Sequence, residues 1–170
     1  MNAVGLKLPL VLSAIVLIGA TILLAFHSAG DRTQPIAFNH KKHAENNVDC
    51  HVCHRHVLES EKAGMPGISV CARCHEDVVH VSPERKKLQT YVSAQMEIPW
   101  KTVYDVPQHV LFSHKRHVVA GKLGCPECHG EVSGMSSPFT EPLTDLGMDA
   151  CVDCHRTLYK NPHECLHCHR

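Results

Sequence analysis

All ten cysteines of this chain occur in five Cys-x-x-Cys-His pentapeptides, and this pattern constrains the fold more than any other feature. Numbered in chain order, the motifs occupy residues 50–54, 71–75, 125–129, 151–155 and 165–169. Two thiols three residues apart on one turn can add to the two vinyl groups of one porphyrin, and the next side chain can reach its iron. Each motif therefore predicts one covalently attached haem c, giving five in total.

The residues that would hold these haems follow directly from the motifs. The predicted thioether cysteines are Cys50, Cys53, Cys71, Cys74, Cys125, Cys128, Cys151, Cys154, Cys165 and Cys168. The predicted proximal iron ligands are His54, His75, His129, His155 and His169.

Zinc is the main alternative, because the gap between Cys53 and Cys71 suits a zinc ribbon. An odd number of pairs argues against it, since five pairs cannot close into four-thiolate sites without a remainder. Disulfides are a weaker alternative. A thioredoxin-like redox pair would need a βαβ pattern, which this sequence lacks.

Composition predicts an unusual core. Aromatic residues make up only 5% of the chain, and apolar runs are scarce after residue 30, so the macrocycles would replace much of the missing apolar core. No strand-like alternation extends over a useful length, which predicts a mostly irregular fold with short α-helices. The formal net charge is zero with histidine neutral, and this gives no argument for nucleic acid as a partner.

The amino-terminal segment predicts a membrane anchor. Residues 8–26 form an uncharged run of nineteen, which as a helix just spans a hydrocarbon core. Lys7 precedes the run, so the positive-inside bias places the amino terminus in the cytoplasm and the haems on the periplasmic or outer face of the cell membrane. The alternative is a cleaved signal peptide with its site near residues 28–30, for which the apolar run is long.

An internal repeat predicts the domain organisation. Residues 38–43 and 112–117 share the pattern Phe-x-His-x-x-His, and each copy precedes a haem motif. We expect an anchor at 1–30, a two-haem module at 31–81, a linker at 82–108 and a three-haem module at 109–170. The linker should contain a helix within 82–96, with Leu88 and Val92 on one side, and residues 133–146 should form a loop.

The remaining histidines supply candidate distal ligands. Sixteen histidines, less the five in the motifs, leave eleven. The two repeats make His40, His43, His114 and His117 the best candidates, because imidazole is a common iron ligand. The fifth distal ligand stays open among His109, His56, His80, His163, Met135 and Met148. His51 and His167 lie inside their own motifs and should be exposed.

With the Phe-x-His-x-x-His and Cys-x-x-Cys-His patterns together, the chain resembles the class III multihaem cytochromes c. That resemblance implies that the first histidine of each pair caps the haem of its own motif and the second reaches a neighbouring haem. A closer resemblance is to the pentahaem cytochrome subunits of alternative complex III, a menaquinol-oxidising respiratory complex. It is carried by residues 34–43, 98–114, 128–135 and 148–156. Where that family often has a histidine this chain has Tyr104, and His109 is near enough in sequence to substitute.

The resemblance implies an electron-transfer subunit with no catalytic residues of its own. Electrons from menaquinol would pass through iron-sulfur clusters of membrane partners and these haems to a soluble cytochrome or an oxidase. One alternative is a stand-alone periplasmic carrier tethered to the membrane. A multihaem reductase is a further alternative, but it needs an iron with an open position, and the surplus of histidines argues against one.

Overall fold

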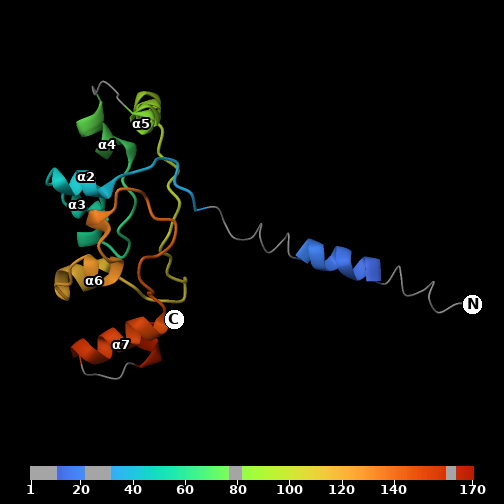
Figure 1. Ribbon diagram of the computed structural model, residues 1–170. Coiled ribbons are helices and arrows are strands. Elements are labelled where there is room, and N and C mark those ends of the chain that lie inside the picture. The colour runs from blue at the N-terminus through green and yellow to red at the C-terminus, as the bar shows by residue number, and fades with distance from the viewer. Residues whose placement is uncertain (1–10, 22–31, 77–81, 160–163) are drawn as a thin grey trace, which may run out of the picture. The chain divides into compact units, whose positions relative to one another are not determined.

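The computed structural model describes residues 11–21, 32–76, 82–159 and 164–170. The chain divides into two compact units, Met1–Arg32 and Thr33–Arg170 (Figure 1). The finer division of the second unit into a two-haem and a three-haem module remains a prediction.

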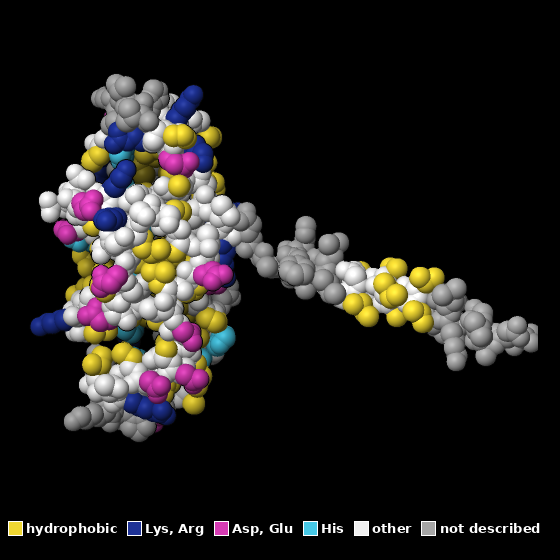
Figure 2. All heavy atoms as spheres, in the orientation of Figure 1, with side chains coloured by type: hydrophobic (Ala, Val, Ile, Leu, Met, Phe, Trp, Pro, Cys, Tyr) yellow, Lys and Arg dark blue, Asp and Glu magenta, His cyan; other side chains and the backbone are white. Residues whose placement is uncertain are grey.

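The first unit contains a helix at residues 11–21, and apolar side chains cover much of the face seen in Figure 2. No helix within the described ranges combines the length and apolarity needed to span a bilayer. The predicted span of residues 8–26 extends beyond this helix at both ends, and residues 8–10 and 22–26 lie outside the described residues. The membrane anchor therefore remains a prediction.

The second unit is a succession of short helices joined by irregular segments. In chain order these are α2 (His40–Glu45), α3 (Cys50–Cys53), η1 (Arg55–Leu58), α4 (Ile68–His75), α5 (Pro83–Ala94), η2 (Arg116–Ala120), α6 (Pro126–His129), η3 (Val132–Gly134), α7 (Met148–Tyr159) and η4 (Cys165–His167). In the described ranges the only β-type pairing is an isolated bridge between Val110 and His169. The predicted mixture of short helices and irregular chain is thus confirmed.

Helix α5 forms where the linker helix was predicted. The Ser82 hydroxyl accepts a hydrogen bond from the Arg85 N–H at 3.3 Å, and Pro83 occupies the first turn, where its missing N–H costs nothing. Gln95 ends the helix in the left-handed region, with φ of 51°. Leu88 and Val92 both pack on the core, as their spacing predicts.

That core is small. Among the described residues only Ile36, Ile68 and Ile98 are buried hydrophobics, at 6%, 8% and 6% exposure. Cys71 and Trp100 pack against them together with Leu88, Tyr91 and Val92 of α5. Trp100 also lies edge-on to Phe38, with 6.3 Å between ring centres. Three isoleucines cannot hold a unit of this size alone, which is consistent with macrocycles supplying apolar surface.

Candidate haem-binding centres

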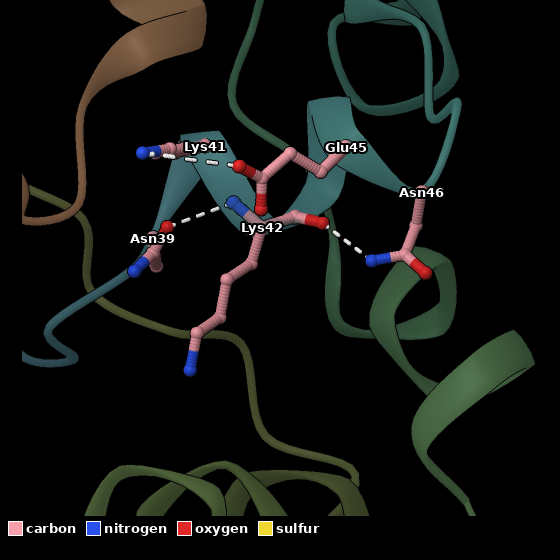
Figure 3. Close-up of polar contacts among 5 residues, drawn as sticks. All are labelled: Asn39, Lys41, Lys42, Glu45 and Asn46. Carbon is pink, nitrogen blue, oxygen red and sulfur yellow. Dashed lines mark hydrogen bonds and ion pairs between the residues drawn. The ribbon is translucent and has the colours of Figure 1, made fainter.

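The first histidine pair lies on α2, which begins with a side-chain cap. The Asn39 Oδ1 accepts a hydrogen bond from the Lys42 N–H at 2.8 Å, and Lys41 and Glu45 form an exposed ion pair at 3.8 Å (Figure 3). Both lysines are exposed, whereas His40 and His43, three residues apart, are half-buried on one side of the helix. The cap and the exposed lysines together direct the two imidazoles toward the interior.

The two copies of the repeat have the same local geometry. Phe38 lies edge-on to His40 at 4.7 Å and stacks on His43 at 4.4 Å, measured between ring centres. In the second copy the corresponding distances from Phe112 to His114 and His117 are 4.8 and 4.7 Å. The phenylalanine therefore fixes the orientation of both imidazoles in each copy, which gives a physical reason for its place in the pattern.

Hydrogen bonds at Nδ1 prepare several of these histidines for metal binding. The Nδ1 of His43 lies 2.8 Å from the Asn39 carbonyl, and that of His117 lies 2.8 Å from the Ser113 carbonyl. His114 and His54 bond the carbonyls of Glu61 and Gly64 in the same way, at 2.8 and 3.0 Å. Because a carbonyl only accepts, Nδ1 must carry the proton, and the lone pair on Nε2 is left for a metal.

The fold brings the rings of four motif histidines close to those of histidines from other segments. The ring centres of His43 and His75 lie 6.2 Å apart, those of His114 and His129 6.3 Å, those of His117 and His155 5.9 Å, and those of His109 and His169 5.5 Å. In the last three pairs the ring planes are within 17° of parallel. Each pair joins the predicted proximal ligand of one motif to a predicted distal ligand.

These separations are close to what one metal ion between two imidazoles requires. An imidazole nitrogen binds a first-row metal at about 2.0 Å, so two rings on opposite sides of one ion have their centres about 6.4 Å apart. The direct stacks of Phe38 and Phe112 on their histidines are shorter, at 4.4 and 4.7 Å. The residues present therefore fit a haem iron held by two histidines.

Burial lowers the pKa values of three predicted ligands. Burial is the largest cause of the lowered pKa of His40, and the neighbouring imidazoles of His54 and His43 add to it, so that the pKa falls from 6.5 to about 4. The pKa of His75 is lowered by burial and by His43, and that of His129 by burial, His114 and His54. All three imidazoles are therefore neutral at physiological pH, as an iron ligand must be. The pairing of His40 with His54, which the resemblance implies, remains a prediction.

The six candidates for the fifth distal ligand are placed very differently. His109 faces His169, and the Arg170 N–H bonds the His109 carbonyl at 3.0 Å, which holds this segment beside the fifth motif. His109 itself is exposed, as are His56 and Met148, the last at 68%, so its contact with His169 and not its burial sets it apart. The Met135 carbonyl accepts a hydrogen bond from the α2 backbone. His80 and His163 lie outside the described residues. His51 and His167 are exposed, as predicted.

The thiols are available for thioether bonds. All ten cysteines are free, and they lie on α3, α4, α7 and η4 and at or within α6. Burial raises the pKa of Cys53, Cys71, Cys125, Cys128 and Cys151. In the described part of the chain no three metal-binding side chains converge on one point, as a zinc site would require.

A cavity of 440 Å³ lies beside the fourth motif, a size within the range of small-molecule sites. His117 and His155 line it together with Phe112 and Leu111. Cys168 of the fifth motif forms another part of its wall. Glu61, Ser113 and Arg116 also line it, so its wall is partly apolar and partly polar. Two neighbouring imidazoles beside apolar side chains are compatible with a porphyrin, whose propionates a cation such as Arg116 could pair.

Tyr104 has a role that sequence reasoning missed. Its ring lies edge-on to His129, with 4.6 Å between centres, and its hydroxyl accepts the Leu143 N–H at 2.8 Å. Thr144, the next residue, donates its hydroxyl to the Cys128 carbonyl. The side chain thus holds the loop at 143–144 against the third motif. The spacing of residues in the sequence gave no indication that the Tyr104 side chain lies beside His129, a predicted proximal ligand.

Comparison with known proteins agrees with this geometry. Residues 25–98 match the class III cytochrome C family, and residues 110–170 match cytochrome c7 and related cytochrome c. Both parts of the chain are therefore similar to c-type cytochromes that carry several haems. The chain is also 35% identical over 100 residues to a protein of Nitratidesulfovibrio vulgaris named "Menaquinone reductase, multiheme cytochrome c subunit". The match covers 58% of this chain and 46% of that relative, so the chain spans less than half of the relative's length.

Proposed function

We propose that this chain is a membrane-anchored pentahaem cytochrome c that carries electrons for a quinone-linked respiratory complex. The observation that carries the proposal is the set of imidazole pairs, in which motif histidines face histidines of other segments at 5.5 to 6.3 Å. An iron with two imidazole ligands has no open position for a substrate, so its chemistry is one-electron transfer. The chain's contribution is to hold each iron in a low-spin state and to exclude water around it.

The resemblance to alternative complex III favours menaquinol oxidation as the source of electrons. In this proposal, iron-sulfur and quinol-oxidising membrane subunits deliver electrons to the cytochrome, which passes them to a soluble cytochrome or an oxidase. The anchor at residues 8–26 would keep the haems on the periplasmic or outer face of the cell membrane.

The name of the Nitratidesulfovibrio relative supports a second candidate, in which electrons flow toward menaquinone. The same row of haems would then accept electrons from a soluble donor and deliver them to the membrane subunits. The two candidates differ in direction only, because a bis-histidine haem can pass an electron either way.

Purification of the tagged chain from its native membrane tests the proposal. We expect five haems per chain by pyridine haemochrome assay, and co-purifying iron-sulfur and polytopic membrane subunits. A chain that purifies alone with five haems would support the tethered stand-alone carrier instead, and fewer than five would refute the pentahaem assignment.

Direction is tested on the purified complex under anaerobic conditions. Rapid reduction of the haems by a menaquinol analogue supports the oxidising role. Rapid oxidation of the prereduced haems by a menaquinone analogue, without rapid reduction by the menaquinol analogue, supports the reducing role.

A further inference from the structure

We infer that the five motifs form one unbranched row in the spatial order second, first, third, fourth, fifth. The second and fifth motifs are then its ends, and each interior motif has two neighbours. This order differs from the order of the motifs in the sequence. The inference rests on the proposed function, because it requires a haem at every motif.

Helix α2 joins the second motif to the first. His40 and His43 lie three residues apart on one side of this helix, so their side chains are neighbours. The ring of His43 lies 6.2 Å from that of His75 in the second motif. The chain runs from α2 through residues 46–49 directly into α3 and the first motif, and the Val48 N–H bonds the His43 carbonyl at 3.0 Å, which holds that motif beside α2. This short helix therefore lies between the second and first motifs and keeps them adjacent.

The second copy of the repeat joins the third motif to the fourth in the same way. His114 faces His129 of the third motif at 6.3 Å, and three residues later His117 faces His155 of the fourth motif at 5.9 Å. These two links make the second and first motifs neighbours, and the third and fourth motifs neighbours.

Backbone hydrogen bonds join the first motif to the third. The Lys41 N–H on α2 bonds the Met135 carbonyl at 2.9 Å, just after the third motif. The His114 N–H and Nδ1 both bond the Glu61 carbonyl, in the segment that follows the first motif, at 3.0 and 2.8 Å. His114, the predicted distal ligand of the third motif, is thus held in place by the segment that follows the first motif.

Residues of the fourth and fifth motifs line the same cavity. The cavity beside His117 and His155 is also lined by Cys168 of the fifth motif. The Leu111 N–H donates to the Cys168 carbonyl at 2.7 Å. The fifth motif is therefore bonded directly to the segment that carries His114 and His117, the predicted distal ligands of the third and fourth motifs.

Figure 1 shows the same succession within the second unit: α4 lies toward one end, α2, α3 and α6 in the middle, and α7 at the other end.

An unbranched row makes every interior centre obligatory for an electron that crosses from one end to the other. The electron enters an iron as Fe(III) becomes Fe(II), and leaves it for the next iron by the reverse change. The donor and acceptor are the quinone-linked subunits and the soluble redox protein of the proposed function.

The order is tested on the intact holoprotein by exchanging single distal ligands. His43→Met alters the centre of the second motif, at an end, and His114→Met alters that of the third, in the interior. A methionine ligand raises the potential of its own haem, which is then reduced first. The electron on that haem repels electrons that enter the adjacent haems, which lowers the midpoint potentials of those haems. This repulsion falls with distance, so only the nearest haems should be affected. Midpoint potentials are followed haem by haem through their assigned methyl signals in nuclear magnetic resonance.

We expect His43→Met to lower the midpoint of one other haem, and His114→Met to lower the midpoints of two. Exposed His51 gives the control, since His51→Ala should shift none. Two lowered midpoints for His43→Met, or one for His114→Met, would overturn the order while leaving five haems in place. A haem count below five would instead refute the proposed function. If either variant fails to mature, the iron positions in a crystal structure of the unmodified holoprotein decide the order directly.

Discussion

Replacement of His109 by alanine tests the least expected ligand pairing in the protein. His109 stands apart from both Phe-x-His-x-x-His segments, yet its ring faces that of His169 at 5.5 Å and 17°. If these two imidazoles hold the iron of the fifth motif, His109→Ala removes one strong-field nitrogen. The thioethers of Cys165 and Cys168 keep the haem in place, so its iron becomes five-coordinate or binds water.

The size of the effect follows from the structure. One of five irons changes, so about one fifth of the low-spin signal should convert to high spin, and the potential of that haem should rise. The His109 and His169 ring centres must move apart from 5.5 Å to admit the iron, whose two bonds require about 6.4 Å.

Electron paramagnetic resonance of the oxidised holoprotein measures the conversion, with the haem count per chain as the check on maturation. His56→Ala and Met148→Ala are matched controls, because both were rival candidates and are exposed like His109, whereas His109 is the one of the three whose ring stacks on that of His169. Both should remain wholly low-spin. A wholly low-spin His109→Ala, with conversion in His80→Ala, His163→Ala or either control, would refute the pairing.

Three further predictions follow from the same geometry. Mass spectrometry of the fully matured chain should show five covalent haems, and a smaller number would contradict the thioether assignment. Because burial lowers the pKa of His40 from 6.5 to about 4, its free imidazole is already neutral well below pH 7 and available to an iron. The low-spin spectrum should therefore be unchanged on acidification through neutral pH, and conversion of one haem near pH 6 would contradict this. Asn39→Ala should lower the free energy of unfolding by about 1 kcal/mol in denaturant titration, since it removes the cap of α2, and an unchanged value would show that the cap does not stabilise the helix.

The sequence was most informative where chemistry acts over a few residues. A Cys-x-x-Cys-His motif and a His-x-x-His pair are local patterns, so the cysteines, the proximal histidines and four distal candidates could be named without a structure. The helix that begins after Ser82 could also be predicted from the sequence. Its signals are all local: the capping serine, the proline that follows it, and the spacing of Leu88 and Val92.

What the sequence could not provide depends on contacts between distant segments. The choice of His109 over Met148 rests on the bridge between Val110 and His169, which pairs residues far apart in the chain. The contact of Tyr104 with His129 is of the same kind. The ligand roles of all these histidines remain predictions, although the fold brings together the rings that those roles require.

The three-isoleucine core has a consequence for the life of the protein in the cell. A chain with so little buried apolar surface among its described residues would gain much of its folded stability only when the predicted haems are attached. If attachment follows export, as the predicted anchor implies, the newly exported polypeptide would be open to proteases until the haems are in place. A cell short of haem would then hold little folded precursor, and the abundance of the protein would follow the haem supply.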